Sequence, residues 1–117
     1  MNKVILIDDD PINNFVNRKL ILKLKGDCEI VEFLNAIDAL NYLKDNSADV
    51  IFLDLAMPDM DGWDFINEYT KMNLKYPVFV LTTSIDPEDK KRAEQYPVIS
   101  GFFVKPLTVK ETEAIIS

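Results

Sequence analysis

Residues 4–11 read VILIDDDP, and this stretch decides the fold class. Its first four residues are apolar, and they lead at once into three aspartates and Pro11. A continuous apolar run indicates a strand buried on both faces, which is typical of parallel sheets covered by helices. Asp10 followed by proline is a favoured helix start, because aspartate caps the first turn and proline suits its first position. The stretch therefore predicts a strand that leads directly into a helix.

Further apolar runs predict four more strands. Residues 50–53, 78–81 and 102–104 are continuous apolar runs, each bounded by polar or turn residues. Such runs again indicate strands that are covered on both faces. Residues 28–33 differ because two glutamates interrupt the apolar residues, and this mixture predicts a strand at the edge of the sheet.

Apolar residues at helical spacing fill the segments between these runs, and each segment begins at a residue that favours a helix start. A capping box, Thr108 to Glu111, opens the last helix. That helix has only about two or three turns before Ser117, and it is either natively short or truncated there. The other starts, with their apolar positions, are Pro11 (Ile12, Phe15, Val16, Leu20 and Leu24, ending at Gly26), Asn35 (Ala36, Leu40, Leu43), Asp61-Gly62 (Trp63, Ile66, Tyr69) and Asp86-Pro87 (Ala93, Tyr96).

The alternation of strands and helices predicts one α/β domain across residues 1–117. Right-handed crossovers between parallel strands place helices on both faces of the sheet, which gives a doubly wound (βα)5 sandwich. A length of 117 residues leaves no room for a second domain of ordinary size. A hydrophobic content of 48% is enough to form a packed core.

The residue counts exclude several classes of function. Lys and Arg number 13 against 20 Asp and Glu, and the net charge of −7 disfavours nucleic acid and anionic membranes as direct partners. The absence of histidine excludes Ser-His-Asp triads, histidine zinc sites and a phosphohistidine on this chain. Cys28 is the only cysteine, which excludes an intrachain disulfide and favours a reducing, cytoplasmic location. No apolar run approaches the roughly 18 residues that cross a bilayer.

Carboxylates follow two of the predicted strands directly. Asp8 and Asp9 follow the first apolar run, and Asp54 follows the run 50–53. The carboxyl ends of parallel strands form the crevice in which α/β sheets bind ligands, so these acids are expected to converge. Converging carboxylates repel one another unless a cation lies among them, and Mg²⁺ prefers such oxygen ligands. The pattern predicts a Mg²⁺ site, whereas Asp10 is interpreted as a helix cap outside it.

Two further polar residues occupy equivalent strand ends. Thr82 follows the run 78–81, and Lys105 follows the run 102–104. A lysine supplies positive charge to a carboxylate or phosphate, and a threonine hydroxyl donates to a phosphoryl oxygen. Together with a metal they would stabilise a phosphoryl group, and Asp54 would be the nucleophile that forms an acyl phosphate. Taken alone, Thr82 is an ordinary strand residue and Lys105 an ordinary surface cation.

Four stretches in fixed order carry a family resemblance. They are residues 5–11 (ILIDDDP), residues 52–62 (FLDLAMPDMDG), Thr82, and residues 103–106 (FVKP). In this order and at this spacing they resemble the receiver domain of bacterial two-component response regulators, which is the CheY-like family. The resemblance spans essentially the whole chain.

The resemblance implies a role for each acid. Asp54 matches the residue that accepts the phosphoryl group. Asp8 and Asp9 match the acidic pair that holds Mg²⁺ directly or through water. Ala56 matches the position whose backbone carbonyl also binds the metal.

The resemblance also implies a switch and a sheet topology. Thr82 matches the switch hydroxyl, and Lys105 matches the lysine that pairs with the phosphoryl group. Phe102 matches an aromatic position that changes rotamer on activation, although ordinary strand packing is an equally good interpretation of it. The family's sheet has the strand order 2-1-3-4-5, and its Lys-Pro peptide bond is cis.

The function that the resemblance implies is that of a signalling phosphoacceptor rather than an enzyme. Such a domain takes a phosphoryl group from the phosphohistidine of a sensor kinase or histidine phosphotransfer protein that docks near the first helix. It promotes only its own phosphorylation and slow dephosphorylation, and it then switches the binding of a downstream protein or effector domain. The family also implies a homodimer through the fourth helix, fifth strand and fifth helix.

Three alternatives are weighed against this interpretation. A haloacid-dehalogenase-type phosphatase also uses an aspartate nucleophile with Mg²⁺, but it needs a second acid two residues later, where this chain has Ala56. A pseudo-receiver would keep the fold as a binding module without phosphorylation, and missing acids or a missing lysine would indicate it. A flavodoxin-like FMN site is disfavoured, because acids at the end of the first strand repel phosphate.

Overall fold

Five strands and five helices alternate along residues 3–116, the part of the chain that the computed structural model describes. The strands are β1 (Lys3–Ile7), β2 (Glu29–Phe33), β3 (Val50–Asp54), β4 (Val78–Thr82) and β5 (Ile99–Val104). The helices are α1 (Pro11–Leu24), α2 (Ala36–Asp45), α3 (Gly62–Lys71), α4 (Pro87–Ala93) and α5 (Val109–Ile116). The longest of these helices has 14 residues, and none in the described part is long and apolar enough to cross a membrane.

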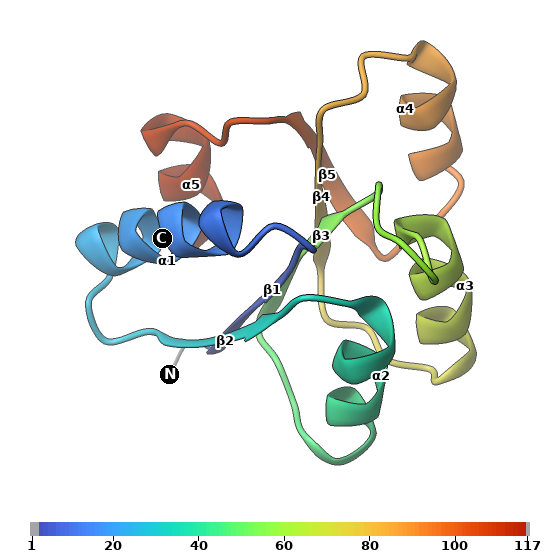
Figure 1. Ribbon diagram of the computed structural model, residues 1–117, viewed down its shortest axis with the longest axis horizontal. Helices are drawn as coiled ribbons and strands as arrows, with labels where there is room; N and C mark the ends of the chain where they lie inside the picture. The colour runs from blue at the N-terminus through green and yellow to red at the C-terminus, as the bar shows by residue number, and fades with distance from the viewer. Residues whose placement is uncertain (1–2, 117) are drawn as a thin grey trace.

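The strands form one parallel sheet in the order β2-β1-β3-β4-β5, which confirms the predicted fold class and strand order (Figure 1). β2 lies at the edge of the sheet, and its residues are half-buried or exposed, in agreement with its two glutamates. All five strands run in the same direction, so their carboxyl ends lie together along one side of the sheet, which is called the carboxyl edge below. This edge is where the predicted site residues gather.

The predicted element bounds differ from the observed ones by more than one residue at β5 and α4. β5 begins at Ile99, before the apolar run 102–104, because its pairing with β4 extends backwards to Val78. α4 ends at Ala93, so that Tyr96 lies beyond the helix that its spacing had suggested. The last helix begins after Thr108 as predicted, and it is described to Ile116. Ser117, with Met1 and Asn2, lies outside the described residues.

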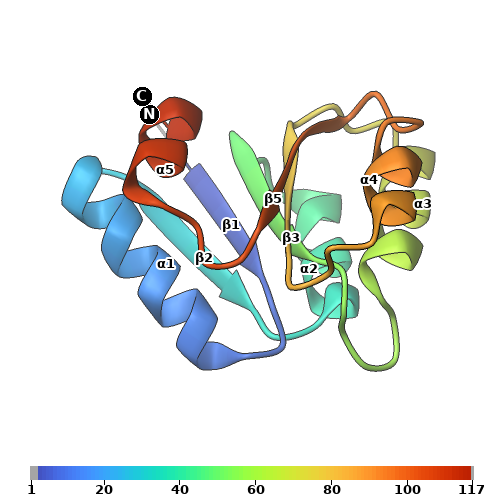
Figure 2. The ribbon, with the colours of Figure 1, turned by 90° about the horizontal axis from the view of Figure 1, so that it is seen from above.

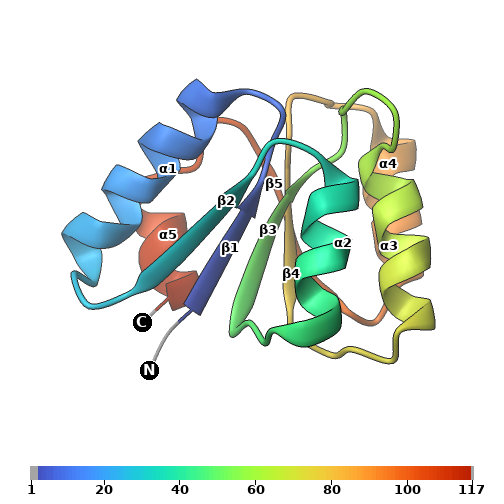
Figure 3. The same cartoon turned by 60° about the horizontal axis from the view of Figure 1, so that its bottom comes forward.

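Helices cover both faces of the sheet. α1 and α5 lie on one face, whereas α2, α3 and α4 lie on the other (Figure 2; Figure 3). Alternate residues of β1 therefore enter different cores, with Val4 and Leu6 on the α1 and α5 side and Ile5 and Ile7 on the α2 and α3 side. Strands that are buried on both faces need continuous apolar runs, which explains the pattern seen in the sequence.

The predicted helix caps are confirmed. The side-chain oxygens of Asp10, Asn35, Asp61 and Asp86 each accept a hydrogen bond from a backbone N–H in the first helical turn. At α5, the Thr108 hydroxyl accepts from the Glu111 N–H, and the Glu111 carboxylate accepts from the Thr108 N–H. These reciprocal bonds satisfy donors that a helix start leaves free.

The first half of α1 does not bury the face that its apolar spacing suggests, whereas Leu24 of the same spacing packs against the core. Ile12, Phe15 and Val16 are 69%, 54% and 53% exposed. The residues of α1 that are buried against the sheet are Asn14 and Ile21. The spacing therefore located the helix correctly but not the inward side of its first half, and it leaves an apolar stripe facing the solvent near the site.

Gly62 allows α3 to begin close beneath the end of β3. A side chain at this position would place its Cβ 2.7 Å from the Cα of Leu55 and 2.8 Å from the carbonyl oxygen of Asp54. The Gly62 N–H donates to the Leu55 carbonyl at 2.9 Å. A residue without a Cβ is needed for this approach, which closes the loop that follows Asp54.

Candidate functional site

The structure brings the three predicted acids together at the carboxyl edge of the sheet. Asp54 is the last residue of β3, and Asp8 and Asp9 directly follow β1. One carboxylate oxygen from each residue lies within 4.8 Å of the other two. Asp8 and Asp54 are buried, at 4% and 5% exposed, whereas Asp9 is exposed. The cluster therefore has two buried carboxylates and one that faces the solvent.

Lys105 reaches this cluster from the end of β5. Its Nζ lies 2.7 Å from a carboxylate oxygen of Asp8 and 3.5 Å from one of Asp54. The side chain of Lys105 is only 13% exposed, so its charge is shielded from bulk water. Buried acids are tolerated when a cation of this kind neutralises them. The peptide bond between Lys105 and Pro106 is cis, as the resemblance implies.

Backbone N–H groups hold the two buried acids in place. The N–H of Ala56 donates to Oδ1 of Asp54 at 3.3 Å, and the N–H of Asp10 donates to Oδ1 of Asp8 at 2.9 Å. Both bonds come from residues two positions further along the chain, in the loops that follow β1 and β3. Oδ2 of each acid faces Lys105. Each carboxylate is therefore fixed on one side by its own loop and on the other by the lysine.

The burial and crowding of these carboxylates change the acidity of Asp54. The pKa of Asp54 is raised from its ordinary value of 3.8 to about 6, chiefly by loss of solvation and next by the negative charge of Asp8. Lys105 and the Ala56 N–H act in the opposite sense on this pKa. Burial and a neighbouring negative charge both make the ionised form of a carboxyl group less favourable in free energy. A divalent cation among the acids would relieve that cost.

The donor set suits a hard divalent cation. All three groups offer carboxylate oxygens, which are the ligands that Mg²⁺ prefers. One carboxylate oxygen of each residue lies within 4.8 Å of the other two, so the three face one shared space. Asp8, Asp9 and Asp54 could therefore hold such a metal. The carbonyl of Ala56 as a further ligand stays a prediction.

Thr82 is buried at the end of β4, next to the site, and its hydroxyl is engaged by its own loop. Its Oγ1 accepts a hydrogen bond from the Ser84 N–H at 3.0 Å. The Ser84 hydroxyl in turn donates to the carboxylate of Asp89 in α4 at 2.6 Å. The Thr82 carbonyl accepts from the Lys105 N–H at 2.8 Å. A short chain of bonds thus connects Thr82 both to α4 and to Lys105.

Phe102 lies half-buried in β5 and packs against the small core beneath α4. That core contains Trp63, whose ring stacks on Tyr96 at 6.0 Å between centroids. The guanidinium of Arg92 in α4 lies 4.5 Å from the centre of the Trp63 ring. These contacts attach α4 to α3 largely through aromatic surfaces. The intermediate exposure of Phe102 fits both ordinary packing and the switch position that the resemblance implies.

Asn14 is a residue of the site region that the sequence did not single out. Its side chain is 1% exposed, and Nδ2 donates to the carbonyls of Asp8 at 3.1 Å and Phe33 at 3.3 Å. It therefore joins the ends of β1 and β2 immediately beside the acids. The available signal was its spacing, because Asn14 lies two helical turns before Ile21 and on the same face of α1.

Comparison with known families and curated proteins shows which proteins this chain is similar to. A profile of the response regulator receiver domain matches residues 4–117. Among curated proteins, the chain is 28% identical over 115 residues to a probable C4-dicarboxylate response regulator, DctR, of Halalkalibacterium halodurans, covering 98% of this chain and 50% of that protein. It is 30% identical over 115 residues to the sensor histidine kinase RcsC of Salmonella typhimurium, covering 96% of this chain and 12% of that one. The chain thus spans half the length of DctR and a small part of RcsC.

Solved structures share the fold over nearly the whole chain. A two-component response regulator from Cytophaga hutchinsonii superimposes with a TM-score of 0.88 at 30% identity, covering 97% of this chain and 92% of that one. The receiver domain of the Francisella response regulator 1452 superimposes with a TM-score of 0.82 at 26% identity, with the same coverage of each chain. These likenesses agree with the profile match in family and in extent.

Proposed function

This chain belongs to the response regulator receiver domain family, and from that premise we propose that it is the phosphoacceptor of a two-component phosphorelay. Asp54 accepts the phosphoryl group, and the donor is a phosphohistidine on a sensor kinase or a histidine phosphotransfer protein. The observation that carries the proposal is the grouping of Asp8, Asp9 and Asp54 within 4.8 Å, with the charge of Lys105 beside them. Phosphoryl transfer needs this combination of acids and cations more than it needs acid-base groups.

The transfer step uses the carboxylate of Asp54 as nucleophile. An oxygen of Asp54 bonds to phosphorus as the P–N bond of the phosphohistidine breaks, and the imidazole leaves with the electron pair of that bond. Lys105 lies 3.5 Å from Asp54, where its ammonium can offset the charge of the incoming phosphoryl oxygens. Mg²⁺ held by Asp8, Asp9, Asp54 and the carbonyl of Ala56 would supply further charge neutralisation and in-line positioning. The product is an aspartyl phosphate, so the domain is a signalling phosphoacceptor.

Switching begins at Thr82 in this proposal. A dianionic group on Asp54 attracts the Thr82 hydroxyl away from the Ser84 N–H that it now accepts from. Because Ser84 also binds Asp89 in α4, that movement is transmitted to α4. Phe102 then changes its packing against the core beneath α4, without a hydroxyl of its own to bond. The two arrangements pre-exist, and phosphorylation shifts their populations.

The exposed stripe on α1 supports a docking surface for the phosphodonor. Ile12, Phe15 and Val16 lie at positions i, i+3 and i+4, and each is more than half exposed. An apolar stripe of this kind on a helix is commonly covered by a partner. α1 follows Asp10 directly after the acids, so a protein docked there would reach Asp54. A cytoplasmic location, expected from the sequence, and a homodimer through α4, β5 and α5 stay predictions.

Phosphorylation by a small-molecule donor tests the proposal directly. The wild-type chain incubated with acetyl phosphate and Mg²⁺ should gain the mass of one phosphoryl group, and peptide mapping should place it on Asp54. Asp54→Asn should gain none, while Asp38→Asn, an exposed acid in α2, serves as the matched control and should be labelled normally. Undiminished labelling of Asp54→Asn would refute the assignment of the phosphoacceptor.

The same preparation separates the alternatives. A pseudo-receiver would show no labelling of the wild-type chain. A phosphatase of the haloacid-dehalogenase type would turn over a phosphomonoester repeatedly, whereas a receiver would not. Amide NMR with beryllofluoride and Mg²⁺ should show shifts at Thr82, Ser84 and Phe102 if the switch operates as described. Phe102→Ala should still be labelled at Asp54 but should lose the shifts in α4.

A further inference from the structure

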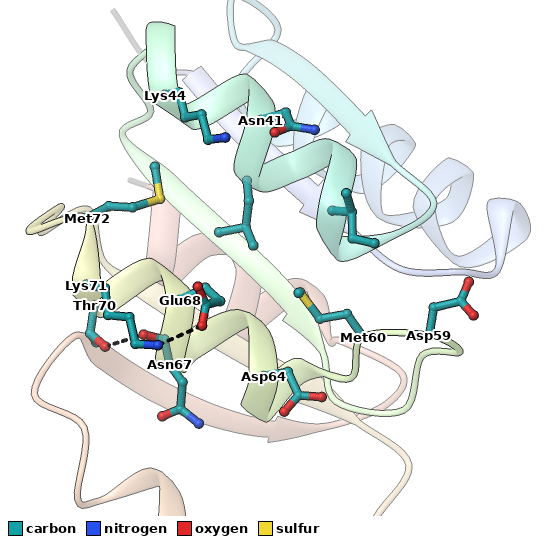
Figure 4. A pocket seen from close by; sticks show the side chains of 12 residues that line it. Asn41, Lys44, Asp59, Met60, Asp64, Asn67, Glu68, Thr70, Lys71 and Met72 are labelled. Atoms are coloured by element: carbon teal, nitrogen blue, oxygen red, sulfur yellow. Dashed lines mark hydrogen bonds and ion pairs between the residues drawn. The ribbon is translucent and has the colours of Figure 1, made fainter.

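A groove lies between α2 and α3, on the opposite face of the sheet from α1 and α5 (Figure 4). Its volume is about 790 Å³. Apolar side chains line it: Ile37 and Leu40 come from α2, Met60 from the loop before α3, and Met72 from the position directly after α3. Ile37 is 48% exposed, and both methionines are half-buried against the core. Methionine side chains are flexible and polarizable, which suits them to surfaces that bind other proteins.

The charges around this groove are separated along its length. Asp59 and Asp64 lie beside Met60 at one end, whereas Lys44 and Lys71 lie beside Met72 at the other (Figure 4). Asp64 belongs to the first turn of α3, and Lys44 and Lys71 belong to the last turns of α2 and α3. Lys71 also forms an exposed ion pair with Glu68 at 2.9 Å. The groove therefore has an acidic end, apolar side chains along its length, and an end at which two lysines stand with one glutamate, Glu68, that also lines the groove.

We propose that this groove binds an amphipathic helix of another protein, aligned antiparallel to α2 and α3. The apolar stripe of that helix packs on Ile37, Leu40 and the two methionines. Its first turn is acidic and lies beside Lys44 and Lys71, and its last turn is basic and lies beside the aspartates of the other end.

Charge complementarity fixes this orientation. α2 and α3 run in the same direction, because both connect parallel strands of one sheet (Figure 3). A helix that runs in the opposite direction places its dipole antiparallel to theirs, and acidic first turns with basic last turns are what helices favour. Its natural end charges then meet opposite charges of the groove. α2 and α3 have ten residues each, so they offer a contact of about 15 Å, or about three helical turns.

The helices of this chain do not fit the groove themselves, which is why we infer a different protein rather than a second copy. α1 has no acidic residue in its first turn, and the apolar residues Ile115 and Ile116 of α5 are packed into the core of this chain. α4 has acids in its first turn and bases in its last, but it has seven residues and no apolar stripe. α2 and α3 form the walls of the groove.

The proposal goes beyond phosphotransfer and does not depend on it. The helix α1 lies on one face of the sheet, whereas α2 and α3 lie on the other (Figure 2). A phosphodonor on the α1 stripe and a helix in the groove therefore bind to different faces. None of the residues that line the groove is Asp8, Asp9, Asp54 or Lys105. Loss of phosphorylation and loss of helix binding are therefore separable.

Two synthetic peptides of about 14 residues test the proposal on the full chain. Both carry leucines at helical spacing. One has glutamates in its first turn and lysines in its last, and the other has the two charge sets exchanged. Titration of each into ¹⁵N-labelled protein, followed by amide NMR, gives the affinity and the site. We expect saturable shifts confined to α2, α3 and the loop before α3, with the first peptide binding about fivefold more tightly or better.

Variants identify the groups responsible. Ile37→Asp places a charge among the apolar side chains at an exposed position and should abolish binding of both peptides. Lys44→Glu combined with Lys71→Glu should remove the preference for the first peptide. Asp54→Asn, which cannot be phosphorylated, should bind the first peptide with unchanged affinity. Retention of this binding keeps the test independent of the proposed phosphoacceptor.

Three outcomes would overturn the proposal. The first is the absence of saturable shifts in the groove at millimolar peptide. The second is equal affinity of the two peptides, because charge would then not set the orientation of the helix. The third is a dependence of the groove signals on protein concentration without peptide, which would identify a second copy of this chain as the occupant.

Discussion

The ammonium group of Lys105 lies 2.7 Å from a carboxylate oxygen of Asp8, although the two residues are 97 positions apart in the chain. The same group is 3.5 Å from Asp54, so its shorter contact is with the acid of β1 rather than with the proposed phosphoacceptor. Lys105 thereby neutralises a buried acid in the resting protein. It also stands close enough to Asp54 to meet a phosphoryl group there.

Replacement of this lysine should affect chemistry more than folding. Lys105→Gln keeps a side chain of similar length but removes the charge, and we expect labelling by acetyl phosphate to slow by about tenfold or more. Lys110→Gln, an exposed lysine of α5, is the matched control and should be labelled at the wild-type rate. Equal rates for all three proteins would exclude Lys105 from the transfer step.

Removal of the Asp54 charge should stabilise the metal-free protein at neutral pH. The pKa of Asp54 is about 6 in the folded chain and near 3.8 otherwise, so folding takes up a proton between these values. The free energy of unfolding therefore falls as pH rises through this window. In Asp54→Asn the free energy of unfolding does not decrease in this way, because the side chain does not ionise. The variant should therefore be more stable than the wild type by about 1 to 2 kcal/mol at pH 7.5. The difference should vanish near pH 4.

Urea unfolding with EDTA at several pH values measures this effect. Mg²⁺ should stabilise the wild-type chain and narrow its difference from Asp54→Asn. A variant that is no more stable than the wild type at pH 7.5 would contradict the raised pKa of Asp54.

Loss of the Asn14 amide should weaken both the fold and the acidic site. Asn14→Leu leaves the carbonyls of Asp8 and Phe33 without this donor in a buried place, which costs about 1 to 3 kcal/mol. Metal affinity should fall as well, because the loop that carries Asp8 is no longer tied to β2. Asn13→Leu, at a half-buried position of the same helix, is the control. If both variants bind Mg²⁺ equally well, Asn14 has a structural role only.

The α1 stripe should matter for a protein donor but not for a small one. Phe15→Asp places a charge at the centre of the exposed stripe, so transfer from a phosphorylated histidine phosphotransfer domain should slow by about tenfold. Its labelling by acetyl phosphate should stay unchanged. Ile37→Asp, similarly exposed but on the opposite face of the sheet, should transfer normally from both donors. Slow labelling of Phe15→Asp by acetyl phosphate would point to damage of the site instead of lost docking.

A side chain at Gly101 in β5 should destabilise the fold. An added Cβ would lie 2.8 Å from the Phe79 ring and 2.9 Å from the Phe103 ring, so Gly101→Ala should destabilise the fold by about 1 to 3 kcal/mol. The same change at Gly26 meets only ordinary contact at 3.5 Å and should be nearly neutral. Phe79→Leu should restore part of the stability of Gly101→Ala. Equal melting temperatures for the two alanine variants would contradict this account.

Much of the fold followed from short stretches of sequence. The strands were located by continuous apolar runs, and the helix starts by residues such as Asn35 and Asp61, whose caps involve partners only a few positions away. Hydrogen bonds between residues a few positions apart depend on the local sequence, so helix caps can be predicted from it. The end of α4 and the start of β5 were placed wrongly, because pairing with β4 and not local composition decides where β5 begins.

The amino-acid sequence by itself determined which residues stand at the strand ends, and the parallel direction of the strands places Asp8, Asp9 and Asp54 on the same side of the sheet. They meet because β1 and β3 are neighbours in the sheet. Tertiary structure alone decided which side of α1 is buried, where Asn14 is inside and Phe15 outside. It also decided that Lys105 binds Asp8 more closely than Asp54, and that α2 and α3 leave a groove between them. The physical reason is distance along the chain. A polar side chain can be buried where backbone carbonyls from other segments accept its hydrogen bonds. The spacing of residues within one helix does not reveal where those carbonyls lie.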